Sequence, residues 1–134
     1  MTFAGLVLAT TLLAPAEPVP AAALELPPPR KTGGLPLMEA LARRASSREY
    51  DAREVPLEHL SSLLWAGFGI NRPDGHRTAP SARNWQEVDI YVLLKRGAFL
   101  YDAKAHRLVP VVAEDVRALG GTQDFAKTAP LTLV

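Results

Sequence analysis

Residues 87–95 read EVDIYVLLK, and the even-numbered positions from 88 to 94 are all apolar. An alternation with period two is typical of a half-buried β-strand. Residues 98–102 (AFLYD) and 106–112 (HRLVPVV) follow after short turns, the first of them at Arg96-Gly97. Closely spaced strands of this kind predict an antiparallel hairpin system. Pro110 lacks a backbone donor, which predicts that the third strand lies at an edge.

Helical patterns precede this predicted sheet. Residues 35–46 (LPLMEALARRAS) and 56–68 (PLEHLSSLLWAGF) each begin near a proline and carry leucines at helical spacing. The polar segment 71–84 predicts a loop. After the sheet, residues 113–119 and 124–127 predict short helices. Residues 130–134 (PLTLV) predict one more apolar strand, which would need a covering partner.

The N-terminal region has the pattern of an export signal. Residues 3–14 (FAGLVLATTLLA) form an apolar run too short to span a bilayer, so we expect no stable membrane span. Small residues that follow at 21–23 could supply a cleavage site. No cation precedes the run, and a frayed apolar terminus is the alternative. We predict a signal peptide over 1–23, a Pro-rich linker over 24–34, and export to the periplasm.

Composition excludes several functional classes. The 134 residues contain 15 Lys plus Arg against 14 Asp plus Glu, for a formal charge of +1. This balance argues against a general nucleic-acid or membrane-surface binder, which needs a basic face. The chain has no Cys, so disulfides and thiolate sites are excluded. The three histidines match no metal-ligand spacing, and no glycine-rich nucleotide motif is present.

The first candidate site spans Arg44 to Arg48 (RASSR). Two guanidiniums with Ser46 and Ser47 between them could clamp a phosphate, because arginine offers a rigid fork of donors and serine adds neutral donors. The alternative is that arginines near the end of a helix only complement its dipole.

The second candidate site spans residues 79–86 (APSARNWQ), just before the first predicted strand. Ser81, Asn84 and Gln86 carry hydroxyl and amide groups that could recognise the polar edge of a planar heterocycle. The alternative is a loop whose side chains cap its own backbone.

The order of these segments is more specific than either alone. Arg44-x-Ser46-x-Arg48 precedes residues 63–72 (LLWAGFGINR), and residues 78–86 (TAPSARNWQ) follow. From about Leu35 to Val134 the chain resembles the N-terminal half of the nitroreductase family, and most of all its SagB-type dehydrogenases.

The resemblance implies an α+β fold, with helices around an antiparallel-dominated sheet. It also implies an intertwined homodimer with FMN bound at the subunit interface, so that both clusters would line one shared hollow. Position 83 is arginine here, where a small or apolar residue is commoner in the family. The implied cofactor-binding residues are Arg44, Ser46, Arg48, Pro80, Ser81, Asn84 and Gln86.

The resemblance also implies a reaction class. We expect an FMN-dependent oxidoreductase that transfers hydride through flavin N5 between a small-molecule donor and acceptor, with no catalytic protein nucleophile. The family's C-terminal half is not in this chain. The alternative is therefore a truncated or degenerate half-domain, non-catalytic and acting only through a partner.

Overall fold

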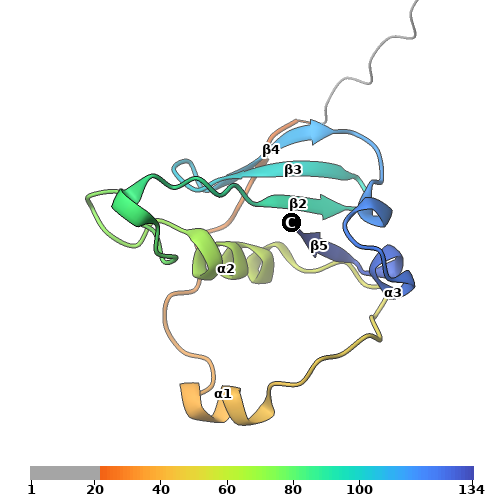
Figure 1. Cartoon of the computed structure of the whole chain (residues 1–134), viewed down its shortest axis with the longest axis horizontal. Helices are drawn as coiled ribbons and strands as arrows, with labels where there is room; N and C mark the ends of the chain where they lie inside the picture. The colour runs from red at the N-terminus through yellow and green to blue at the C-terminus, as the bar shows by residue number, and fades with distance from the viewer. Residues whose placement is uncertain (1–21) are drawn as a thin grey trace, which may run out of the picture.

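The computed structural model describes residues 22–134, which form one antiparallel sheet with helices around it (Figure 1). The strand order is β1-β4-β3-β2-β5, and every neighbouring pair is antiparallel. The predicted α+β class with an antiparallel sheet is therefore confirmed. The strands are β1 (Leu24–Glu25), β2 (Tyr91–Leu94), β3 (Gly97–Asp102), β4 (Arg107–Val112) and β5 (Leu131–Leu133).

The helices follow the predicted order with changed bounds. They are α1 (Leu37–Arg43), α2 (Leu57–Phe68) and α3 (Asp124–Thr128), with 3-10 turns η1 (Ala82–Asn84) and η2 (Arg117–Leu119). The predicted helix over 113–119 is wrong for most of its length. Both the backbone N–H and the guanidinium of Arg117 donate to the Asp115 carboxylate. Such a local side-chain bond competes with helical pairing.

The β2–β3–β4 meander is the predicted hairpin system. Leu94 pairs with Gly97 across the first turn, and Phe99 lies opposite Pro110 on β4. The prediction that this third strand lies at an edge is wrong, because β1 pairs with Leu108 and Arg107. Pro110 fits because the two-residue β1 ends before reaching it, so no ladder bond is lost there.

The predicted linker is also wrong over its first residues. Leu24–Glu25 form β1, and Leu26, which is 9% exposed, lies in the core. The alternation Leu-Glu-Leu at residues 24–26 forms a short strand and directs Leu26 into the core. Because prolines surround it in the sequence, this segment has the composition of a linker. The predicted signal peptide lies, apart from its last two residues, outside the described part of the chain.

Helix α2 covers one face of the sheet and creates the core. Leu60 and Leu64 are 1% and 0% exposed, as the leucine spacing predicts. They pack with alternate residues of three strands. That cluster contains Val92, Leu94, Phe99, Tyr101 and Leu108, together with Leu26 and Ala103.

The last strand, β5, pairs with β2 at the edge of the sheet, with Thr132 opposite Leu93. Within residues 22–134, β2 is the one strand that neighbours β5. On this side of the sheet, Gly120 lies so close to Leu93 and Thr132 that a Cβ there would meet both side chains.

Helix α1 stands away from the rest of the chain. Two extended segments connect it to the body, and none of its residues is buried (Figure 1). Leu37 and Met38 are 72% and 75% exposed. Among the described residues, no helix is long and apolar enough to cross a membrane.

Candidate functional site

The first cluster lies in an exposed segment directly after α1. The helix ends at Arg43, and Arg44 already has an extended backbone. Ser46 and Arg48 follow, both exposed. Because only Arg43 lies in the last helical turn, the helix dipole does not account for Arg48.

Arg44 and Arg48 differ from Arg43 in their ion pairing within the described residues. Within residues 22–134, no carboxylate forms an ion pair with Arg44 or Arg48, whereas the adjacent Arg43 pairs with Glu39. The Arg48 guanidinium lies 5.7 Å from the ring centroid of Phe125 in α3, which in turn lies 6.2 Å from the Tyr50 ring. Two unpaired guanidiniums beside hydroxyl groups are suited to bind an anion.

The second cluster lies in the loop that leads from α2 to β2. The Ser81 hydroxyl accepts from the Gln86 backbone N–H at 2.7 Å and donates to Glu87 at 2.8 Å. Ser81 thus supports its own loop, as the capping alternative proposed. Pro80 precedes it and is exposed.

The Gln86 side chain forms three hydrogen bonds that connect parts of this loop. Its side-chain oxygen accepts from Arg77 Nε at 2.8 Å, and its nitrogen donates to the Asn84 side chain at 2.9 Å and to the Gly75 carbonyl at 3.1 Å. The Arg77 guanidinium also donates to the Phe68 carbonyl and lies 4.2 Å from the Phe68 ring centroid. Arg77 therefore joins the loop to the end of α2, a role that sequence motifs did not reveal.

The loop backbone adopts an uncommon conformation. Arg83, Asn84 and Gln86 have φ values of 52°, 55° and 52°. A left-handed backbone conformation is unfavourable for residues other than glycine. It persists where contacts with neighbouring residues stabilise it, and such positions are often found at functional sites. The bonds of Gln86 supply those contacts. The Asn84 side-chain nitrogen has no hydrogen-bond partner within residues 22–134, so it can donate to a ligand.

The structure does not bring the two clusters together within one chain. They flank opposite ends of α2 (Figure 1). A helix of 12 residues is roughly 18 Å long. Three cavities of the described residues are lined by other side chains, and none of these three contains any of the seven predicted cofactor-binding residues. None of these three cavities is therefore the expected shared hollow.

The family was tested by comparison with known sequences. The sequence model of the "Nitroreductase family" matches residues 41–134. The chain belongs to the nitroreductase family. Members are typically flavin-dependent oxidoreductases that generally use FMN, act on small molecules and form dimers.

Two nitroreductase relatives cover most of the chain. "Putative nitroreductase MJ1384" of Methanocaldococcus jannaschii is 32% identical over 108 residues, covering 73% of this chain and 54% of its own length. A crystal structure titled as a putative nitroreductase from Ralstonia eutropha JMP134 has a TM-score of 0.78 at 43% identity, covering 91% of this chain and 61% of its own. The chain therefore spans little more than half the length of these relatives.

The nitroreductase cofactor can be tested against these residues. FMN carries a phosphate and a planar ring with polar edges. Arg44 and Arg48 offer unpaired cations to a phosphate, and Asn84 offers an amide donor. The hydrogen-bond donors of these residues therefore fit FMN.

Among the described residues, no group of three His, Cys, Asp or Glu could hold a metal ion.

A buried polar network was also missed from the sequence. The Ser61 hydroxyl, fully buried on α2, donates to the Pro27 carbonyl and lies 2.7 Å from His106 Nε2. The Tyr101 hydroxyl lies 3.0 Å from His106 Nδ1. Burial lowers the pKa of His106 and raises the pKa of Tyr101. No local pattern joins residues 27, 61 and 106, so this network could not be predicted.

Proposed function

We propose that this chain is part of an FMN-dependent oxidoreductase that transfers hydride through flavin N5 to or from a small organic substrate. The observation that carries the proposal is the pair of exposed guanidiniums of Arg44 and Arg48 on either side of Ser46, which form no ion pair within residues 22–134, in a chain of the nitroreductase family. When bound, the flavin supplies the redox chemistry, and the protein supplies binding and orientation.

Each cluster has a distinct task in this proposal. Arg44, Ser46 and Arg48 bind the phosphate end through charge-assisted hydrogen bonds. Asn84 donates to a polar edge of the ring, and Pro80 lies beside it. Ser81 and Gln86 hold the loop backbone in its left-handed conformation, since their polar atoms are already bonded within the loop. They act as positioning residues.

We propose that a second copy of the chain completes the site. In one copy the clusters lie toward opposite ends of α2, so one FMN would take its phosphate contacts from one subunit and its ring contacts from the other. The exposed apolar face of α1 supports this arrangement. Leu37, Met38 and Leu41 are 72%, 75% and 55% exposed, which is costly unless another surface covers them.

Subgroup and compartment are proposals of the same kind. The three motif segments support the SagB-type dehydrogenases as the subgroup. The apolar run at residues 3–14 supports a signal peptide and a periplasmic location. Reduced nicotinamides are scarce there, so the donor would be either another electron source or an organic substrate oxidised directly.

Titration of the purified chain with FMN tests the proposal. We expect visible flavin absorption that stays with the protein on gel filtration. Arg44→Gln and Arg48→Gln should each weaken FMN binding about tenfold or more, which corresponds to the loss of a charged hydrogen bond. Arg43→Gln is the matched control, because Arg43 already pairs with Glu39.

Two outcomes would contradict the proposal. Equal weakening by the control and the two test variants would show that the segment binds FMN only through its general charge. A folded dimer that takes up no FMN would favour the non-catalytic half-domain instead.

A further inference from the structure

A hollow of about 450 Å³ lies where the N-terminal segment crosses the end of α2 and the β3–β4 turn. Leu26 and two prolines of the N-terminal segment form one wall, and Trp65 and Ile70 form another. The volume falls within the range of small-molecule sites, which are mostly apolar with a few polar groups.

Two cations border this hollow. Lys31 and Lys104 both line it and both are exposed. The Lys31 ammonium lies 5.2 Å from the centroid of the Trp65 ring, so a cation–π contact holds it at the hollow. Within residues 22–134, neither lysine forms an ion pair with a carboxylate.

The remaining polar side chain is His106, whose pKa is lowered by burial, which favours the neutral ring. Both ring nitrogens of His106 have partners, Nδ1 with Tyr101 and Nε2 with Ser61 and the Pro27 carbonyl. The hollow therefore combines two free positive charges with apolar and aromatic walls. A ligand that satisfies both features is an anion on a flat apolar body.

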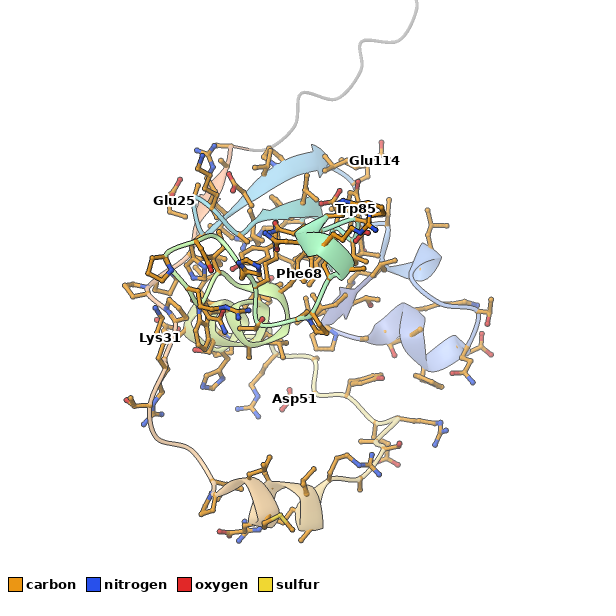
Figure 2. All side chains as sticks on the ribbon, turned by 60° about the vertical axis from the view of Figure 1, so that its left-hand side comes forward. Glu25, Lys31, Asp51, Phe68, Trp85 and Glu114 are labelled. Carbon is orange, nitrogen blue, oxygen red and sulfur yellow. The ribbon has the colours of Figure 1, made fainter. Side chains whose placement is uncertain are left out.

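This hollow differs from the proposed flavin site. None of the seven residues assigned to FMN lines it. One wall comes from Leu26, Pro28, Pro29 and Lys31, which precede the segment 41–134 that matches the family model. Figure 2 shows Lys31 on the extended segment that runs from the sheet past α2 toward α1.

We propose that this hollow binds a small aromatic anion, for which a carboxylate is the probe, with the ring against Trp65, Ile70 and Leu26 and the acidic group between Lys31 and Lys104. Each lysine ammonium offers a point charge and three donors to the acidic group of such a ligand.

Isothermal titration of the purified chain with naphthalene-2-carboxylate tests this site. We expect saturable binding, and the neutral naphthalene-2-carboxamide should bind about tenfold more weakly. The double variant Lys31→Gln/Lys104→Gln should weaken binding of the acid by a similar factor. Lys95→Gln, an exposed lysine outside this hollow, is the matched control and should bind normally.

A second variant tests the cavity itself. Ala105 is exposed in the β3–β4 turn and lines the hollow, so Ala105→Phe should block binding without unfolding the chain. Equal affinity for acid and amide, unchanged binding by the double variant or by Ala105→Phe, or no binding at all would overturn the proposal. FMN uptake, followed separately by absorption, should be the same in all these variants, so the two proposals can fail independently.

Discussion

Ser61 Oγ and His106 Nε2 lie 2.7 Å apart, and both atoms contact the carbonyl oxygen of Pro27. This junction joins α2, the β3–β4 turn and the N-terminal segment. Since Ser61 is fully buried, its hydroxyl has no access to water and depends on these partners.

Ser61→Ala should destabilise the chain. The substitution removes the hydroxyl that bonds to both the Pro27 carbonyl and His106 Nε2, and leaves these two buried groups only their 3.2 Å contact with each other, at a cost of about 1–3 kcal/mol. Ser62→Ala is the comparison and should cost less, because the Ser62 hydroxyl donates to the Glu58 carbonyl and accepts from the Arg30 backbone N–H where water can replace both bonds. Urea unfolding would measure both, and equal losses would contradict a special role for Ser61.

The stability of the chain should fall as the pH drops from 7.5 to 5. Burial lowers the pKa of His106 in the folded state, so the unfolded state binds more protons in this window. The contribution is complete above the ordinary histidine pKa of about 6.5 and is lost below it. His106→Asn, which tolerates the φ of 52°, should flatten this decline.

Melting temperatures at pH 7.5, 6.5 and 5 would test this dependence. Exposed His59 supplies the control, and His59→Asn should keep the decline of the original chain. A His106→Asn variant with an unchanged pH slope would show that other groups titrate in this range.

Gly97→Ala should destabilise the β2–β3 hairpin by about 1–3 kcal/mol. Gly97 has a φ of 142°, and a Cβ there would lie 2.3 Å from the Val112 carbonyl oxygen. Gly67→Ala is a contrasting change inside α2, where a Cβ meets nothing within 4 Å. It should stabilise the chain by about 0.5–1 kcal/mol. Thermal unfolding would measure both variants. Melting temperatures that shift in the same direction for Gly97→Ala and Gly67→Ala would contradict this prediction.

Gln86→Ala should loosen the loop between α2 and β2. It removes the bonds to Arg77, Asn84 and Gly75, at a cost of about 1–3 kcal/mol. Amide hydrogens of residues 75–86 should then exchange faster. Gln123→Ala is the control, since the Gln123 side chain makes no capping bond. Unchanged exchange in Gln86→Ala would show that another contact holds the loop.

The sequence predicted the sheet well because its strands are short-range features. The alternation in 87–95 and the closely spaced strands after it determine a meander whose pairings are all local. The same reasoning failed at Leu24–Glu25, where pairing with β4 joins residues more than 80 positions apart. A strand of two residues between prolines has no local signal that distinguishes it from a linker.

The motifs selected two candidate clusters but did not indicate the hydrogen bonds within them. Spacing identified the Arg44–Arg48 segment and the loop at 79–86, but not how Gln86 and Arg77 are bonded. Gln86 was expected to contact a cofactor, and within this chain its side chain is occupied by Arg77, Asn84 and Gly75. Hydrogen-bond partners depend on how the loop folds back, which residue order alone does not specify.

The separation of α1 from the core has a consequence for how its sequence can vary. Because none of its residues is buried by its own chain, substitutions of Leu37 or Met38 should leave the melting of an isolated subunit nearly unchanged. Natural selection on these apolar positions would then act through assembly rather than through folding. A mutational scan that measures only stability would therefore not detect the importance of the apolar residues of α1.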